Sequence, residues 1–346
     1  MSDFEEFETM IGRGLPDRHP AELADDLLTW ATGVLDIWIR PWREAFDYLR
    51  KLAADDRQRL ARVLVDRYHS ASGDSPDRLN ALTLLGVISH GLHEDGLSGE
   101  RLIRLDALSK RYSFGYGMRF VSFAEAELAA GRQLPPPIAA AFRRTALDRF
   151  RDTDVIAVAT QLTEPVLNVG EKWAEQALAE LPGLAAPWRQ LLTHATTATA
   201  AKPSVRWEKA GRKLLDETGA DAVRETVLSW LALVGGPRTL PLNTDPNEPD
   251  YNNAYDPFNA NALRGIAWLL SFLPPHPDIA PTLGVLVETS LHAIPSLGPR
   301  DLKVANAGVL ALSRIDHHTA VDELSRLANR VTHRRILRLI DTALEA

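Results

Sequence analysis

The stretch DPFNANALRGIAWLLSFL, residues 256–273, has the composition of an α-helix with a well-marked start. Its first residue, Asp256, has a side chain that can accept hydrogen bonds from the backbone N–H groups of a first helical turn. The next residue, Pro257, suits the first helical position because proline loses no hydrogen bond there. The segment therefore predicts an α-helix that begins at Pro257 and is capped by Asp256.

Similar start and stop signals recur in both directions from this segment. Ser75 followed by Pro76 marks another helix start. Residues 201–234 predict two consecutive helices, with Gly219 as the C-cap between them. No part of the chain alternates polar and apolar residues with β-branched enrichment, as strands do. The sequence therefore predicts an all-α protein.

The number and length of these helices indicate how they are arranged. Helices of about 12–18 residues joined by short turns account for nearly the whole chain, and stacked helix pairs with a unit of about 40 residues are typical of HEAT-like proteins. We therefore expect a HEAT-like α-solenoid of stacked helical hairpins. A compact helical bundle is the alternative architecture.

The segment GRQLPPPI, residues 131–138, is the best internal boundary, because three prolines prevent one helix from running through it. We expect three parts on this basis. They are an acidic N-terminal leader over residues 1–20, an N-terminal helical segment over 21–133, and a C-terminal HEAT-like helical segment over 134–346.

The composition of the 346-residue chain bounds its function. The formal net charge is −7, and residues 1–26 carry eight acidic and two basic side chains, so the remaining chain is nearly neutral. Nucleic-acid-binding proteins usually have a basic surplus, which these totals lack. The chain has no cysteine, which excludes disulfides, thiolate metal sites and cysteine nucleophiles.

The N-terminus has neither the apolar core of a secretory signal nor a membrane anchor. The sequence MSDFEEFETM, residues 1–10, is acidic, and no apolar run approaches the ~20 residues of a membrane helix. We therefore expect a cytoplasmic protein that does not enter a membrane. The sequence carries no signal for an oligomeric state.

Two motifs in the C-terminal half resemble one bacterial family. They are KPSVRW at residues 202–207 and GPRDLKVANA at 298–307. Residues 185–346 are similar to the helical region of molybdate-metabolism-regulator-like proteins, which have a large domain of unknown function and often a WGR domain. In longer relatives that domain continues beyond the segment matching 338–346. The resemblance thus implies a helical arm without the large domain, and no activity is carried over.

The polar segment at residues 236–256 interrupts the helical pattern. A calcium-binding EF-hand loop would need glycine and glutamate where Asp250 and Asp256 stand, so the calcium-loop pattern fails. Tyr251 and Tyr255 have no local role, and connectors this long are usually functional or disordered. We expect a loop at the rim of the helical stack with both tyrosines available to a partner. A packed or mobile connector is the alternative.

Basic residues occur on three predicted helices of the C-terminal half. If these helices stack in register, the residues form one basic ridge that binds an anionic partner. The alternative is that acidic neighbours neutralise them by pairing within each helix. The residues are Lys202, Arg206, Arg300, Lys303, Arg330, Arg334 and Arg338.

Other candidate sites have simpler interpretations. His90 and His93 are three residues apart, but they end a helix where imidazole meets the helix dipole favourably. The aromatic and arginine residues of 111–120 could stack nucleic-acid bases, although aromatics near a helix junction are most often core. Asn306 lies in an apolar helix and is expected to bridge two helices through hydrogen bonds. We expect no metal and no cofactor.

No catalytic motif is present in the sequence, so we lean towards a protein that is not an enzyme. The leading expectation is a non-catalytic helical-repeat scaffold that binds a protein or peptide partner through its concave surface. The alternative is a nucleic-acid-binding helical-repeat protein, such as a DNA-glycosylase-like repair enzyme. One concave basic groove containing a tryptophan and an aspartate would favour nucleic acid, whereas scattered charge would favour a protein partner.

Overall fold

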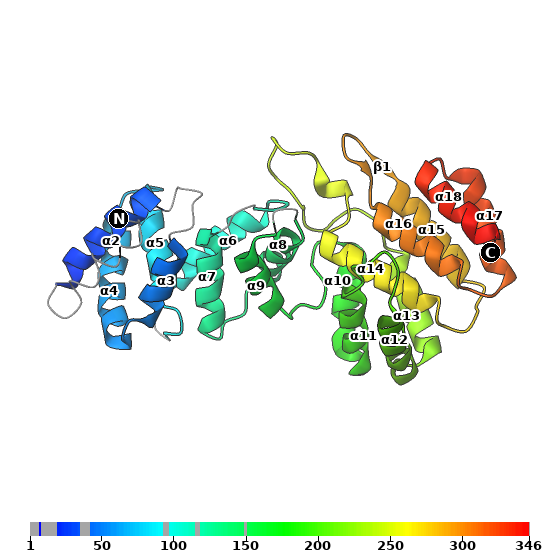
Figure 1. Ribbon diagram of the computed structural model, residues 1–346, viewed down its shortest axis with the longest axis horizontal. Coiled ribbons are helices and arrows are strands. Elements are labelled where there is room, and N and C mark those ends of the chain that lie inside the picture. Colours follow the sequence, from blue (N-terminus) through cyan, green and yellow to red (C-terminus); the bar gives the residue numbers. More distant parts are fainter. Residues whose placement is uncertain are drawn as a thin grey trace. The chain divides into compact units, whose positions relative to one another are not determined.

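The computed structural model describes Phe7 and residues 19–34, 42–92, 97–114, 118–148 and 151–345. Within these ranges it contains seventeen α-helices, two single-turn 3-10 helices and one small β-hairpin (Figure 1). The prediction of an all-α protein is confirmed. None of the described helices is both long enough and apolar enough to cross a bilayer.

The chain forms two compact units that interleave in the sequence. One crossing between the two units, after Ile138, lies at the end of the proline-rich segment 131–138. Unit 1 comprises Met1–Leu108, Tyr116–Ile138 and Asp152–Val158, and unit 2 comprises Ser109–Gly115, Ala139–Arg151 and Ala159–Ala346.

Unit 1 is organised around helix α5, in which residues 80–88 are all buried. Helices α2, α3, α4 and α7 pack against it. The predicted cap at Ser75 is confirmed, because its hydroxyl accepts a hydrogen bond from the Arg78 backbone N–H at 3.3 Å. The helices are α2 (Pro20–Val34), α3 (Trp42–Lys51), α4 (Ala54–Ser70), α5 (Pro76–Ile88), α6 (Ser98–Ser109) and α7 (Met118–Ala129).

The expected acidic leader, residues 1–20, lies almost entirely outside the described residues. Phe7 is described, and it is buried in unit 1 rather than solvated. Its ring lies 4.7 Å from the ring of Trp30 and 6.2 Å from that of Tyr48. Phe7 packs in this way because an aromatic ring gains more from apolar contact than from water.

Unit 2 contains the C-terminal helices, and helices α8 and α9 hold residues of both units. The helices are α8 (Pro136–Ala146), α9 (Thr153–Gln161), α10 (Lys172–Glu180), α11 (Pro187–Thr196), α12 (Val205–Thr218), α13 (Ala220–Leu231), α14 (Pro257–Leu270), α15 (Ile279–Leu291), α16 (Leu302–Leu312), α17 (His318–Arg330) and α18 (Arg334–Glu345). The short elements are η1 (Leu181–Gly183), η2 (Tyr251–Asn253), β1 (Ala293–Ile294) and β2 (Gly298–Pro299).

Helices α10–α18 of unit 2 share one apolar core, and α13–α18 pack in two layers (Figure 1). Helices α14, α16 and α18 are neighbours in one layer, and α13, α15 and α17 are neighbours in the other. The predicted cap of α14 is confirmed, because the Asp256 carboxylate accepts from the Phe258 backbone N–H at 2.9 Å. Gly219 ends α12 with a φ of 93°, which also confirms the predicted C-cap.

Helix α14 is the most buried element of unit 2 and touches α11 through its backbone. A Cβ atom added to Gly265 would lie 2.5 Å from the Cα atom of Ala195 and would overlap with its carbonyl oxygen. Two helix backbones can approach this closely only where one of them lacks a side chain. Gly265 therefore fixes how α14 lies on α11.

We predict that Gly265→Ala destabilises unit 2 by about 2 kcal/mol, although alanine is the better helix former, because the backbone of α11 must shift. Gly183→Ala is the matched control, since no atom lies within 4 Å of an added Cβ there. Hydrogen exchange of the α14 amides would measure the loss separately from unit 1. Unchanged protection in Gly265→Ala would show that the close contact is not required.

Candidate functional site

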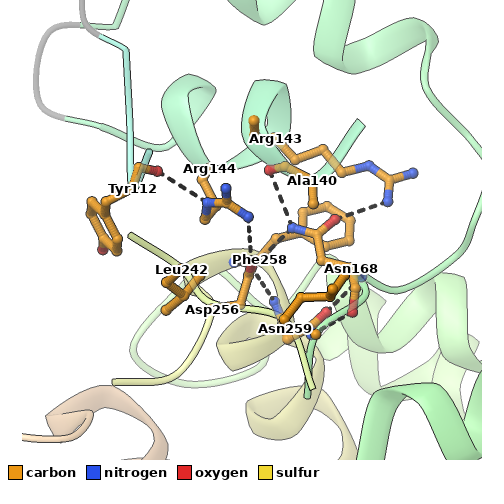
Figure 2. Close-up of polar contacts among 12 residues, drawn as sticks. Tyr112, Ala140, Arg143, Arg144, Asn168, Leu242, Asp256, Phe258 and Asn259 are labelled. Atoms are coloured by element: carbon orange, nitrogen blue, oxygen red, sulfur yellow. Dashed lines mark hydrogen bonds and ion pairs between the residues drawn. The ribbon is translucent and has the colours of Figure 1, made fainter. Parts of the chain in front are cut away.

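The Asp256 carboxylate lies at the centre of a buried polar network in unit 2 (Figure 2). One oxygen caps α14 and also accepts from the Asn168 side-chain amide at 2.9 Å. The other oxygen forms an ion pair with Arg144 Nη1 at 3.2 Å. A buried carboxylate is tolerated when its oxygens are satisfied in this way.

Two arginines of α8 extend the network to other segments. Arg144 donates to the backbone oxygens of Ser109, Arg111 and Tyr112 at 3.0–3.2 Å. The neighbouring Arg143 donates to the Leu162 and Pro165 backbone oxygens and to Asn168, and it lies over the Phe258 ring at 4.6 Å. Burial lowers the pKa of Arg143 to about 10. The network thus holds residues 109–112, α8 and α14 together.

Asn259, in the first turn of α14, connects this network to Glu171. The side-chain oxygen of Asn259 accepts from the Asn168 backbone N–H at 2.8 Å, and its side-chain NH₂ group donates to the Asn168 backbone oxygen at 2.9 Å. The same amide donates to Glu171 Oε2 at 2.7 Å. The other oxygen of Glu171 accepts from the Asp256 backbone N–H at 3.1 Å.

Glu171 is also paired with Arg238, whose Nη1 lies 3.3 Å from Glu171 Oε1. Burial raises the pKa of Glu171 to about 7, and it lowers the pKa of Arg238 below its usual value. For both partners the cost of leaving water outweighs their mutual attraction, as is common for buried ion pairs. The pair is therefore held in place by the surrounding structure.

Glu171 and Arg238 line a pocket of about 200 Å³ beneath residues 236–256. Its other charged or polar side chains include Lys172, Tyr255 and Arg300. Arg300 donates through Nε to the Asn253 backbone oxygen at 2.7 Å, and its guanidinium lies 5.6 Å from the centre of the Tyr255 ring. Three cationic side chains and one carboxylate therefore surround the pocket.

The polar segment 236–256 packs onto unit 2, and the expectation that Tyr255 is available for contact is wrong, whereas Tyr251 is half-buried. Tyr255 is only 5% exposed, and burial raises its pKa to about 12. Tyr251 stacks on Tyr112, with 4.0 Å between ring centres. The segment folds inward because Asn252 accepts from the Leu242 backbone N–H at 2.7 Å and donates to the Asn243 backbone oxygen at 3.0 Å.

Most of the residues predicted to form the basic ridge lie at the same end of the bundle formed by helices α15–α18. Arg300 and Lys303 lie at the start of α16, and Arg334 begins α18, with Arg338 one turn later. Arg330 ends α17 and lies 3.4 Å from Glu288, near the end of α15. The ion pair thus brings the ends of α15 and α17 together and partly neutralises Arg330.

Lys202 and Arg206 do not join this group. Glu208, in the first turn of α12, accepts from Arg314 at 2.7 Å, and Arg314 lies two residues beyond the end of α16. Lys202 and Arg206 therefore lie towards the opposite end of α16 from Arg300. A single basic ridge across all three helices is not formed, because α12 meets α16 at its other terminus.

Sequence reasoning missed Glu171, Lys172, Trp173 and Arg238 as pocket residues. One signal was present in the chain: the tripeptide Gly-Pro-Arg occurs at residues 236–238 and again at 298–300, and both arginines line the pocket. Glu171 carried no such signal, because its partners are far away in the sequence.

The other candidates do not form a site. Across the described ranges, no three His, Asp or Glu side chains are grouped so as to hold a metal ion. His93 lies outside the described residues. In segment 111–120, Tyr112 stacks on Tyr251 and Phe114 packs 5.1 Å from Phe142, so both rings have partners within unit 2.

Comparison with protein-family models, with curated proteins and with solved structures finds no match to this chain. The similarity of residues 185–346 to molybdate-metabolism-regulator-like proteins therefore stays a prediction.

The pKa of Glu171 predicts how the stability of unit 2 depends on pH. The pKa of Glu171 is about 7 in the folded chain, whereas the ordinary value for an exposed glutamate, as in the unfolded chain, is 4.5. Neutral Glu171 therefore stabilises the fold fully below pH 4.5. This contribution, at most about 3 kcal/mol, is lost as pH rises to 7. Glu171→Gln should lose less stability than the wild type between pH 5 and pH 8 in urea unfolding.

Asp216→Asn, on the exposed face of α12, is the charge-matched control and should follow the wild-type pH dependence. The change with pH is the informative quantity, because the glutamine also replaces one acceptor oxygen with an amide. Parallel curves for Glu171→Gln and the wild type would show that Glu171 does not titrate in this range.

Proposed function

We propose that unit 2 is a HEAT-like helical-repeat module that binds an acidic segment of a protein or peptide partner, without catalysis. The observation that carries the proposal is a set of exposed cationic side chains along α16 and α18 that have no ion-pair partner among the described residues. They are Lys303, Arg334 and Arg338. The two-layer packing of α13–α18 supports the HEAT-like assignment.

Helix α16 contributes one mixed stripe to the proposed surface. Lys303 is exposed, while Asn306 and Leu310 are half-buried, and the three are spaced so that they share one face of the helix. The predicted bridge through Asn306 is not seen, since its side-chain oxygen has no hydrogen-bond partner in the described part of the chain. This oxygen is itself buried, so the stripe offers a partner the exposed ammonium of Lys303 rather than this acceptor.

Helix α18 packs beside α16 and adds Arg334 and Arg338, which are four residues apart on the same side of the helix. An acidic peptide lying across both helices would pair with these cations and pack apolar side chains on Leu310. Complementary charge of this kind speeds association and selects the partner.

A catalytic role has little support from the pocket. Both carboxylate oxygens of Glu171 already accept hydrogen bonds, from the Asp256 backbone and from Asn259. A general base needs an oxygen that can reach a substrate proton. Glu171 is better suited to holding the pocket wall than to transferring protons.

Nucleic-acid binding is the weaker alternative because the basic side chains do not lie along one continuous surface. Lys202 and Arg206 lie towards the opposite end of α16 from Arg300, and Arg330 forms an ion pair with Glu288. Strong binding to DNA needs several phosphate contacts along one track. The resemblance to molybdate-metabolism-regulator-like proteins, which we retain as a proposal, fits a helical binding arm but names no partner.

Fluorescence anisotropy with a labelled Asp/Glu-rich peptide would test the proposal. We expect the wild type to bind it in a salt-dependent manner, and Lys303→Glu/Arg338→Glu to weaken binding by at least about ten-fold. Lys202→Glu/Arg206→Glu makes the same charge change towards the other end of α16 and should have little effect.

Two results would contradict the proposed surface. One is the absence of peptide binding in the wild type. The other is an equal loss in both double variants, which would show that total charge rather than position matters. Tight, strongly salt-dependent retention of duplex DNA would favour the nucleic-acid alternative instead.

A further inference from the structure

Two residues that line the pocket beneath residues 236–256, Trp173 and Arg238, carry buried donors that are not fully used by the chain. Within the described ranges, Trp173 Nε1 has no hydrogen-bond partner, whereas Arg238 Nη1 lies 3.3 Å from Glu171 Oε1 in an ion pair without hydrogen-bond geometry. The Arg238 side chain is 9% exposed and Trp173 is 1% exposed. Buried donors are nearly always paired, so the unpaired indole N–H of Trp173 at this pocket indicates a missing acceptor.

The charge of the pocket agrees with an anionic acceptor. Arg238, Arg300 and Lys172 are cationic, and Glu171 is the one acid among the lining residues. Arg300 uses Nε for the Asn253 backbone oxygen and Nη1 for the Gly235 backbone oxygen at 3.5 Å. A guanidinium has five N–H donors, so Arg300 retains several for a ligand.

Two glycines leave the space that the guanidinium groups of Arg238 and Arg300 occupy. Gly170 has a φ of 103°, and a Cβ atom there would lie 2.8 Å from Arg238 Nη2. Gly235 has a φ of 83°, and a Cβ atom there would overlap with Arg300 Nη1. Side chains that are positioned in advance lose less freedom when a ligand binds.

We propose that this pocket binds a carboxylate group, held by the guanidinium groups of Arg238 and Arg300. Planar guanidinium groups match a carboxylate through paired hydrogen bonds. A pocket of about 200 Å³ suits a small group, since pockets for drug-sized ligands start near 300 Å³. Glu171 lies 3.3 Å from Arg238, so it repels a phosphate dianion more than a single carboxylate.

The carboxylate can belong to a free organic acid or to an acidic side chain or C-terminus of a peptide. The inference stands apart from the proposed surface on α16 and α18, because its support comes from donors in the pocket. A failure of one is therefore distinguishable from a failure of the other.

The test uses the full chain with ¹⁵N-labelled tryptophan and follows the indole N–H signal of Trp173, assigned with Trp173→Phe. The probes are succinate, its neutral analogue succinamide, inorganic phosphate, and a short peptide with one acidic residue. We expect succinate or the acidic peptide to shift the Trp173 signal saturably, and succinamide to leave it unchanged. The stronger of these two ligands identifies the source of the carboxylate.

Arg300→Gln should abolish the response, and Arg300→Lys should weaken it by about ten-fold because lysine lacks the paired donors. Arg206→Gln, at a distant cation of unit 2, should respond as the wild type does. The indole signals of the other tryptophans report whether each variant is folded. The proposal is overturned if neither carboxylate probe shifts the signal, if phosphate shifts it more strongly, or if folded Arg300→Gln still responds.

Discussion

The burial of one carboxylate, that of Asp256, is the constraint on which unit 2 depends. An ionised carboxylate removed from water costs several kcal/mol unless donors replace its hydration. Here the donors are the first backbone N–H groups of α14, the Asn168 amide and the Arg144 guanidinium. They come from segments far apart in the sequence, so satisfying Asp256 requires that α8, the segment before α10 and α14 come together.

The buried network around Asp256 is connected to the pocket by Glu171. The Asp256 backbone N–H and the Asn259 amide fix Glu171, and Glu171 in turn holds Arg238 at the pocket wall. Because α10 begins directly after Glu171, the network also sets the start of that helix. A binding pocket whose charged groups are fixed by a buried network can be rigid although it lies beneath a long connector.

The local features of the fold could be predicted from sequence, whereas the site could not. The caps at Ser75, Asp256 and Gly219 depend on neighbours a few residues away, and all three are confirmed. Tyr255 was expected to be exposed because segment 236–256 is polar, yet that polarity serves hydrogen bonds inside the segment and to distant residues. Arg238 and Arg300 share a Gly-Pro-Arg motif, but only the fold shows that the two copies meet at one pocket.

A double-mutant cycle between Asp256→Ala and Arg144→Ala, read by urea unfolding of the two single variants and the double variant, tests the central claim most directly. If the buried pair organises unit 2, the losses are strongly non-additive, with a coupling energy of about 2 kcal/mol or more. Losses that add to within about 0.5 kcal/mol would contradict the account, because they would show that the two residues stabilise unit 2 independently.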